Sequence, residues 1–151
     1  MRKEDTPIKN TKDTPFYSIG TVARMLGVSV HTLRMYEREG LMLPYKKESS
    51  HRLYSDMDVE RLRCIRHAIN EEKISIAGIR RIYALIPCWQ VVKCSDSHRS
   101  KCPAYSEHTK PCWTYDHIQN PCTKLDCRLC DVYKLSSDCG KIKEMITNRP
   151  R

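Results

Sequence analysis

The stretch that most constrains the fold of this chain is residues 17–54, where two runs with the apolar spacing of helices stand on either side of Gly27. The side chains of Ser18 and Ser29, which open these runs, can each accept a backbone N–H as a helix N-cap. Apolar residues recur at helical spacing in the first run, at Ile19, Val22, Ala23 and Leu26. Glycine adopts the left-handed backbone conformation at little cost, so Gly27 is suited to end the first helix. The stretch therefore predicts two short helices joined by a tight turn.

The second helix is expected to end near Gly40 and to expose a polar and basic face. The residues of that face are His31, Thr32, Arg34, Met35 and Arg38. In a helix-turn-helix the second helix lies in the major groove of DNA, where its exposed side chains contact base edges. We therefore predict a DNA-binding unit in which the helix capped by Ser29 is the recognition helix.

Residues 41–54 predict a β-hairpin, because two short extended segments flank a serine-rich turn. Four basic side chains would project from this hairpin beside the recognition helix: Lys46, Lys47, His51 and Arg52. Basic groups in such a wing can neutralise phosphates or enter a minor groove. The alternative is an ordinary solubilising loop.

Two further helices are expected after the hairpin. The first begins at Ser55, and its apolar side is made by Val59, Leu62, Ile65 and Ile69. The second begins at Ser75 and is ended by Pro87. On the first of these helices, Cys64 is expected to be a small core or boundary residue, and three arginines are expected to be solvated: Arg61, Arg63 and Arg66. The fold class is therefore mainly α, with a winged helix-turn-helix domain of about four helices and a hairpin over residues 16–87.

The charge and hydropathy of the chain favour a polyanionic partner. The formal net charge is +9 and the sequence pI is about 9.2. Residues 1–15 are polar and charged, and we expect them to form a flexible arm. No apolar run approaches the about 18 residues of a transmembrane helix, and the N-terminus lacks the apolar core of a secretory signal. These features predict a cytoplasmic protein without a membrane partner.

One series of motifs covers residues 16–86: Y-S-I-G-x-V-A-x-x-x-G-V-S-x-x-T-L-R-x-Y-E-R-E-G-L, then P-x-K, then H-R-L-Y-S-D. This series resembles the winged-helix DNA-binding domain of the MerR family, and residues 33–41 and 76–82 are similar to its heat-shock repressor branch. The resemblance assigns four positions to DNA contact or to holding the wing: Arg34, Tyr36, Arg52 and Tyr54. It also implies that Arg24 can reach a phosphate from the first helix.

The resemblance further implies the partners of the chain. Members of the family bind a pseudo-palindromic operator in double-stranded DNA as homodimers, with half-sites about one helical turn, or a multiple of it, apart. Activating members untwist an overlong promoter spacer, which would make RNA polymerase a partner at the promoter. Most dimers of the family use a long antiparallel helix after the fourth helix. Here Cys88 and Trp89 follow Pro87 at once, so the dimerisation element is left open.

Cysteine content divides the chain near Pro87, because only Cys64 of the nine cysteines lies before it. The segment that follows carries few apolar residues, and in a reducing compartment thiolate–metal bonds hold a chain together more readily than disulfides. It resembles the small cysteine-rich modules with paired Cys-Trp that accompany some bacterial sensory proteins. We therefore predict an irregular metal-binding module over residues 88–140 and a tail over residues 141–151.

The predicted metal ligands are seven cysteines: Cys88, Cys94, Cys102, Cys112, Cys122, Cys127 and Cys130. An iron–sulfur cluster tolerates one C-x2-C pair with remote cysteines, and we rank it slightly above zinc, whose folds usually supply a second such pair. A disulfide framework is the remaining alternative. Cys139 is expected to be dispensable. Three histidines could each replace a thiolate ligand, but a surface position is the preferred interpretation for all of them: His98, His108 and His117.

The function predicted from these features is sequence-specific transcription regulation with a metal- or redox-responsive C-terminal module. One alternative is a zinc-dependent adaptor for protein interactions. Another is a thiol oxidoreductase acting through Cys127 and Cys130, but no βαβ pattern surrounds this pair. The sequence therefore favours a regulator and not an enzyme.

Overall fold

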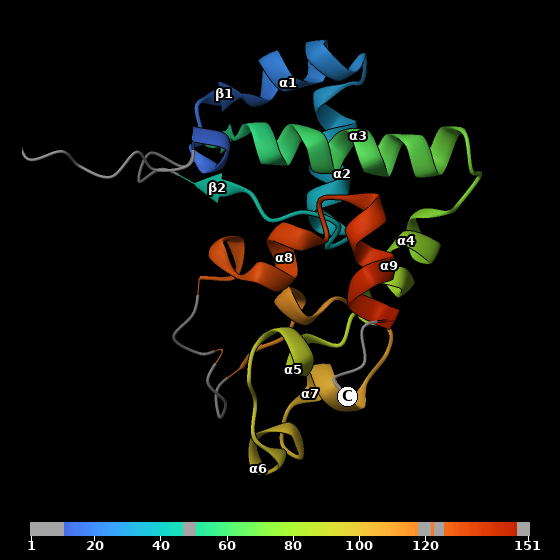
Figure 1. Cartoon of the computed structure of the whole chain (residues 1–151). Helices are drawn as coiled ribbons and strands as arrows, with labels where there is room; N and C mark the ends of the chain where they lie inside the picture. Colours follow the sequence, from blue (N-terminus) through green and yellow to red (C-terminus); the bar gives the residue numbers. More distant parts are fainter. Residues whose placement is uncertain (1–10, 47–50, 118–121, 123–125, 148–151) are drawn as a thin grey trace, which may run out of the picture.

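The computed structural model describes residues 11–46, 51–117, 122 and 126–147, and most of its elements are helices (Figure 1). The α-helices are α1 (Ile19–Leu26), α2 (Val30–Arg38), α3 (Asp56–Asn70), α4 (Ile76–Ala84), α5 (Cys88–Val91), α6 (Asp96–Arg99), α7 (Pro103–Ser106), α8 (Asp131–Leu135) and α9 (Cys139–Thr147). Short 3-10 turns are η1 (Thr11–Asp13), η2 (Cys112–Thr114) and η4 (Cys127–Leu129). Across these described residues, every helix is too short or too polar to span a lipid bilayer.

The first four helices begin at the serines that the sequence indicated. The side chains of Ser18, Ser29, Ser55 and Ser75 each accept a backbone N–H from three residues further on, over 3.0 to 3.2 Å. Gly27 ends α1 with a φ of 66°. Helix α4 ends at Ala84, before the position predicted, and Pro87 instead opens α5. These helices confirm the mainly α fold class.

The predicted hairpin is present and is joined by a third strand. Strands β2 (Tyr45–Lys46) and β3 (Arg52–Tyr54) pair antiparallel, with Tyr45 opposite Leu53. Strand β1 (Tyr17–Ser18) pairs with the other edge of β3, giving the order β1-β3-β2. A strand of two residues is too short to show the alternation that predicts strands, so β1 could not be predicted from the sequence.

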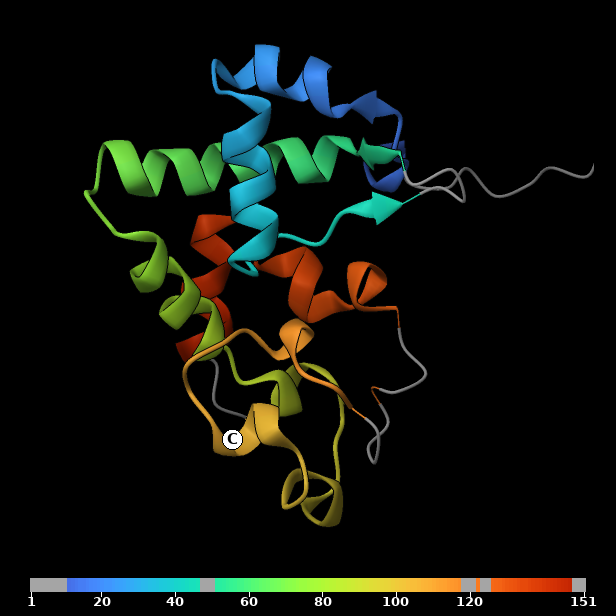
Figure 2. The same ribbon diagram turned by 180° about the vertical axis from the view of Figure 1, so that it is seen from behind.

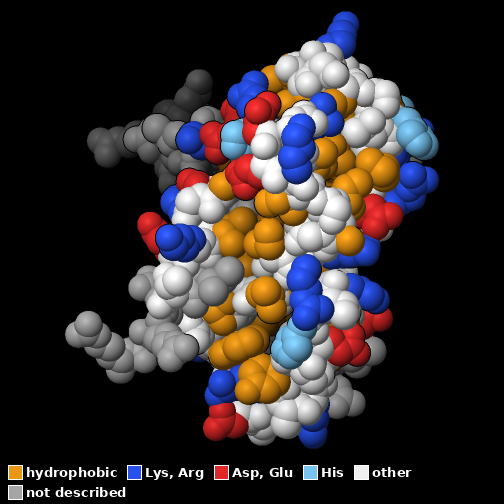
Figure 3. All heavy atoms as spheres, turned by 90° about the vertical axis from the view of Figure 1, so that its right-hand side faces the viewer, with side chains coloured by type: hydrophobic (Ala, Val, Ile, Leu, Met, Phe, Trp, Pro, Cys, Tyr) orange, Lys and Arg blue, Asp and Glu red, His pale blue; other side chains and the backbone are white. Residues whose placement is uncertain are grey.

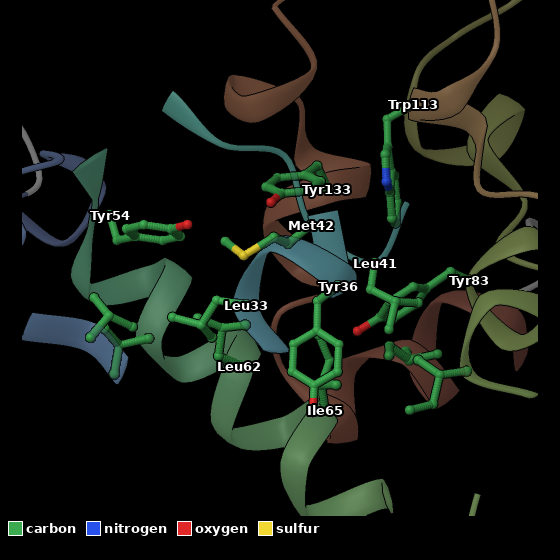
Figure 4. Close-up of a cluster of buried hydrophobic side chains, with 14 of the residues drawn as sticks. Leu33, Tyr36, Leu41, Met42, Tyr54, Leu62, Ile65, Tyr83, Trp113 and Tyr133 are labelled. Atoms are coloured by element: carbon green, nitrogen blue, oxygen red, sulfur yellow. The ribbon is translucent and has the colours of Figure 1, made fainter. Parts of the chain in front are cut away.

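Helix α3 crosses the upper part of the molecule in Figures 1 and 2, with α1 above it and α8 and α9 below it. The apolar core surrounds it and includes Leu33, Leu41, Met42, Leu62, Ile65 and Tyr83 from before Pro87. Four residues from after Pro87 belong to the same core: Trp113, Val132, Tyr133 and Ile142. Trp113 lies between two tyrosines, with ring centroids 5.5 Å from Tyr83 and 5.2 Å from Tyr133 (Figure 4). The few apolar residues of the C-terminal half therefore extend the core of the N-terminal half.

One prediction for α3 is wrong, and one covalent contact of this helix was not foreseen. Arg61 is fully buried, because its guanidinium donates hydrogen bonds to the Leu41 carbonyl at 3.3 Å, to the Tyr133 carbonyl and to the Ser136 hydroxyl. Cys64 is bonded to Cys139 in a disulfide, which ties α3 to α9. In both cases the partner lies some 70 residues further along the chain, beyond the reach of local pattern.

One face of the molecule carries a band of apolar side chains. Figure 3 views the side on which α3 ends and α4 lies, and shows this band flanked by basic side chains. Leu85, which directly follows α4, is 49% exposed. An exposed apolar band of this kind is typical of a surface that contacts another molecule.

Candidate functional site

Helix α2 holds most of its predicted recognition residues at the surface. The exposed ones are Ser29, His31, Arg34 and Arg38. Thr32 is half-buried, and its hydroxyl oxygen lies 2.9 Å from that of Ser29. The side chains of Ser29 and Thr32 are therefore engaged in the helix cap, whereas His31, Arg34 and Arg38 extend the basic face.

Glu37 of α2 connects the recognition helix to the wing. Its carboxylate accepts a hydrogen bond from Arg52 Nε at 2.7 Å and another from the Tyr54 hydroxyl at 2.6 Å. The Glu37 side chain is only 7% exposed, so this ion pair is shielded from water and counter-ions. Burial raises the pKa of Tyr54, and the hydrogen bond to Glu37 raises it further. These contacts fix the angle between α2 and the β2–β3 hairpin.

The two predicted tyrosines lie in the core and not at the surface. Tyr36 and Tyr54 are 1% and 0% exposed. The Tyr36 hydroxyl accepts a hydrogen bond from Arg66 Nη1 at 3.4 Å. Of the two roles that the resemblance allowed for these positions, their burial favours holding the wing over contacting DNA.

The remaining predicted DNA contacts lie around this unit. Arg24 on α1 and His51 at the start of the second wing segment are exposed. Lys46 lies in β2 opposite Arg52, and Lys47 lies outside the described residues. The DNA contacts of these residues stay predictions.

The seven predicted metal-ligand cysteines line one cavity of about 40 Å³. They come from four separate parts of the chain: α5 and the residues after it, the region of α7, η2, and the η4 turn with the described Cys122 before it. In the η4 turn the Cys130 amide donates to the Cys127 carbonyl at 3.1 Å, which places both thiols of the C-x2-C pair on one side. Cys64 and Cys139, joined elsewhere, are not part of this lining.

Burial and neighbouring thiols set the pKa values of these cysteines. A hydrogen bond between the Cys88 and Cys112 thiols lowers the pKa of Cys88 and raises that of Cys112. Burial raises the pKa of Cys94 and of Cys127, and raises that of Cys122 to about 11. Charge on neighbouring thiols adds to each rise. A bound cation would reverse this balance, because coordination removes the thiol proton.

His117 also lines the cavity, although the sequence predicted a surface position. Its Nδ1 lies 3.7 Å from Cys102 Sγ and its Nε2 lies 2.8 Å from the Cys112 carbonyl oxygen. His98 and His108 are not among the lining residues. The available signal was the position of His117 between two cysteines of the series, Cys112 and Cys122.

The donor chemistry of this cavity fits a thiophilic metal or an iron–sulfur cluster. Thiolates are the ligands that both prefer, and seven thiols face one space. In the part of the chain that the structure describes, no three His, Cys, Asp or Glu side chains converge closely enough to hold an ion. The residue types thus suit a metal, while the coordination geometry itself is not formed.

Comparison with known proteins identifies the N-terminal half. Residues 17–85 match the family described as MerR HTH family regulatory protein. These residues are a MerR-family helix-turn-helix domain. The match confirms the family resemblance, and it ends at residue 85.

Similar proteins are named as regulators or as a heat shock protein. HspR of Streptomyces coelicolor, whose name describes a heat shock protein, is 40% identical over 79 residues, 52% of this chain and 52% of its own length. The transcriptional regulator ZntR of Escherichia coli is 36% identical over 70 residues, 46% and 49% of the two chains. The mercuric resistance operon regulatory protein of Pseudomonas fluorescens is 44% identical over 52 residues, 34% and 36%. The chain spans about half the length of the first two relatives and 36% of the length of the third. No solved structure matches the chain.

Residues of the cysteine-rich region form hydrogen bonds with the segment that connects the recognition helix of the MerR-type domain to its wing. This connector comprises residues 40–43. Trp113 Nε1 donates to the Gly40 carbonyl at 2.9 Å, and the Leu43 amide donates to the Tyr133 hydroxyl at 2.8 Å. The Arg128 guanidinium donates to the Leu43 carbonyl. Both ends of the connector are therefore bonded to residues from after Pro87.

Two arginines complete the contact between the halves. Arg128 donates to Asp58 Oδ2 at 2.8 Å and to Oδ1 at 3.2 Å, and Asp58 is 2% exposed. Burial acts to lower the pKa of Arg128, but the hydrogen bonds to Asp58 outweigh it and the pKa is raised. From the other direction, Arg61 of α3 reaches into the C-terminal half and lies over the Tyr133 ring at 3.8 Å. Each half thus supplies one arginine to the other.

Proposed function

We propose that this chain is a sequence-specific, DNA-binding transcriptional regulator whose cysteine-rich region binds a metal and adjusts operator affinity. In this proposal α2 enters the major groove and the wing contacts the phosphate backbone. Two copies bind a pseudo-palindromic operator in double-stranded DNA, and RNA polymerase is the partner at the promoter. Such a regulator acts in the cytoplasm, where its DNA lies, and carries out no catalysis of its own.

The exposed basic face of α2 supports the DNA-binding part of this proposal. Arg34 and Arg38 are exposed on the helix that a MerR-type domain uses for recognition. Arginine is suited to guanine, because its guanidinium donates two hydrogen bonds to the acceptors in the major groove. The net charge of +9 would speed association with DNA through long-range attraction.

The apolar band on the side of α4 is the surface that we assign to dimerisation (Figure 3). Leu85 at the end of α4 would lie within the contact. A second copy would remove this apolar surface from water, which is the main driving force for association. The dimer proposal predicts that Leu85→Glu gives monomers in analytical ultracentrifugation at micromolar concentration, whereas Leu129→Glu, at an exposed leucine in η4, does not.

The metal is the less defined part of the proposal, with zinc and an iron–sulfur cluster as the two candidates. Cys127 and Cys130 would form one pair of ligands, with the remaining ligands drawn from Cys88, Cys94, Cys102, Cys112 and Cys122. When bound, zinc would hold these thiolates in a fixed arrangement, and a cluster would add a redox-sensitive charge. The chain's own contribution is to gather the seven thiols around one cavity.

The observation that carries the regulatory proposal is the set of hydrogen bonds between the cysteine-rich region and residues 40–43. Trp113, which bonds Gly40, directly follows Cys112, and Arg128, which bonds Leu43, stands between Cys127 and Cys130. A change in how these cysteines are ligated would therefore move side chains that position the recognition helix and the wing. Coupling between two such sites is typically worth about 1–3 kcal/mol, a change in affinity of about 5–150-fold.

The test compares operator affinity with metal content in the full chain. An operator is selected from random duplexes, and binding is measured by fluorescence anisotropy for metal-loaded protein, metal-stripped protein and the Cys127→Ser/Cys130→Ser variant. Cys64→Ser/Cys139→Ser is the matched control, because it also removes two cysteines but from outside the cavity. We expect metal loss to change affinity by at least about five-fold, the low end of typical coupling.

The outcomes separate the candidate functions. Unchanged affinity after a demonstrated loss of metal would make the region a structural or dimerising module and would end the sensing proposal. Binding without any preference among duplex sequences would instead favour the zinc-dependent adaptor. An absorption spectrum and elemental analysis of anaerobically purified protein would distinguish zinc from iron and sulfide.

A further inference from the structure

His117 faces the cysteine-lined cavity in the orientation of a metal ligand. It follows η2 by three residues, and its ring is held between the backbone of Cys112 and the side chain of Cys102. Cys102 is 8% exposed and His117 is half-buried, so the thiol of this pair is shielded from solvent while the imidazole is partly accessible. A histidine held from both sides in a cavity with seven thiols is a different environment from the surface position that its sequence context predicts.

The backbone contact fixes which ring nitrogen of His117 carries the proton. A carbonyl oxygen only accepts hydrogen bonds, so Nε2, 2.8 Å from the Cys112 oxygen, must be the donor. The neutral ring then has its lone pair on Nδ1, the atom that faces Cys102 Sγ. Histidines that bind metals usually donate their second N–H to a carbonyl or a carboxylate, which orients the ring and makes the ligating nitrogen more basic. His117 has this arrangement before any metal is bound.

The distance between the two facing atoms agrees with a shared tetrahedral ion. Zinc lies about 2.3 Å from a thiolate sulfur and about 2.0–2.1 Å from an imidazole nitrogen. At the tetrahedral angle, these bond lengths place the two ligand atoms about 3.6 Å apart. Cys102 Sγ and His117 Nδ1 are 3.7 Å apart. The separation of these two atoms therefore agrees with that of two ligands of one ion.

The other thiols of the cavity divide into two groups around this pair. Cys88 is hydrogen-bonded to Cys112, and Cys127 shares the η4 turn with Cys130. These four thiols are sufficient for one site of their own. Cys94 and Cys122 line the same cavity as Cys102 and His117, and charge on the Cys102 thiol acts on both of them. Seven cysteines and one histidine thus make eight donors, enough for two tetrahedral sites.

We propose that His117 and Cys102 begin a second metal site, completed by Cys94 and Cys122, which holds a zinc ion separately from the Cys88, Cys112, Cys127 and Cys130 set. This inference rests on the proposed metal binding and adds a ligand and a division of the ligands to it. Because no three such side chains converge among the described residues, the third and fourth ligands move inward when the ion binds. The ion takes the place of the thiol protons, which are released to solvent. The Cys112 carbonyl links the two sites, since Cys112 belongs to one and orients the histidine of the other.

The experiment measures zinc per chain after anaerobic reconstitution of the full protein with zinc, by elemental analysis and by a chromophoric chelator. The variants are His117→Ala, His117→Cys and, as the matched control, His108→Ala at an exposed histidine outside the cavity. We expect two zinc ions in the unchanged protein and in His108→Ala, and one in His117→Ala. His117→Cys should restore the second ion, because a thiolate can replace the imidazole. Cobalt(II) substitution gives a second readout: His117→Cys should intensify the sulfur-to-cobalt charge-transfer band.

The outcomes distinguish this inference from the proposed function. If His117→Ala retained as much zinc as the unchanged protein, the second site would be refuted while metal binding by the cysteines would stand. The second site would also be refuted, and metal binding would stand, if the protein carried iron and sulfide in amounts that His117→Ala did not alter and bound no additional zinc. If the unchanged protein bound neither zinc nor iron, both the inference and the metal-binding proposal would fail. Helical circular dichroism of each variant at the start of the titration excludes misfolding as the cause of a lost ion.

Discussion

The ion pair between Arg128 and Asp58 gives the sharpest test of the contact between the two halves. Asp58 also caps α3, because its carboxylate accepts the Ser55 amide at 2.8 Å while the Ser55 hydroxyl accepts the Asp58 amide. The Asp58 side chain is 3% exposed and that of Arg128 is 14% exposed. Replacing Arg128 by methionine keeps most of the apolar stem but leaves the Asp58 carboxylate buried without its cation. Removing one partner of a buried pair costs about 3–5 kcal/mol, and the partial exposure of Arg128 favours the low end, about 3 kcal/mol.

The effect of a second substitution on the free energy of unfolding should change sign when the first is present. Asp58→Asn alone should destabilise the protein by about 2–3 kcal/mol, because Arg128 loses its counter-charge. In the Arg128→Met protein the same change should stabilise, by about 1–2 kcal/mol, because it removes an unpaired buried charge. The asparagine oxygen can still accept the Ser55 amide, so the helix cap is retained in both backgrounds.

The assay is urea unfolding of the four proteins, followed by helical circular dichroism and by the fluorescence of Trp89 and Trp113. With a slope of about 2 kcal/mol per M, a loss of 3 kcal/mol lowers the midpoint by about 1.5 M urea. Both tryptophans lie after Pro87, so coincidence of the two probes also reports whether the halves unfold together. If Asp58→Asn destabilised both backgrounds equally, the two side chains would be energetically independent and this account of the contact would be refuted.

Four further substitutions test the DNA-binding unit and its support. Arg34→Ala should weaken operator binding by about 1–3 kcal/mol and relax the preference at one base pair; an equal loss on random duplexes would make Arg34 a phosphate contact instead. Arg52→Ala and Glu37→Gln should weaken binding alike if Arg52 acts by holding the wing, whereas affinity unaffected by Glu37→Gln would assign Arg52 a direct phosphate contact. Trp113→Phe keeps the ring among the core tyrosines but loses the bond to Gly40, so unfolding measurements should show a loss of about 1 kcal/mol; an unchanged midpoint would contradict a stabilising role for that bond.

Sequence reasoning succeeded where neighbouring residues alone determine the structure. A serine cap needs only its own side chain and an amide three residues on, so Ser18, Ser29, Ser55 and Ser75 could be recognised one by one. Gly27 was identified for the same kind of local reason, a left-handed backbone at the end of a helix. The apolar spacing within each helix then gave the side that faces the core.

Sequence reasoning failed where a residue's structural partner is distant in the chain. The burial of Arg61 is favourable because the Leu41 carbonyl, the Tyr133 carbonyl and the Ser136 hydroxyl accept its hydrogen bonds, and none of these acceptors lies in α3. Cys64 gave no sign of Cys139, 75 residues away. In the candidate site, the seven cysteines could be named from their number and crowding, but the proximity of His117 to Cys102 depends on how η2 and α7 pack. No spacing rule contains that information.

The position of Arg61 determines whether the two halves of this chain can be exchanged as independent cassettes. Arg61 belongs to α3, inside the segment that matches the MerR family, yet two of its three hydrogen-bond acceptors lie after residue 130. A chimera that joined residues 1–87 to the effector region of another regulator would keep the arginine and lose these acceptors, leaving a charge in a partly dismantled core. Grafting the cysteine-rich region onto another MerR-type domain would leave Arg128 without Asp58 and the Tyr133 ring without Arg61. Transplanting either half therefore requires that the arginine contacts be rebuilt at the new junction.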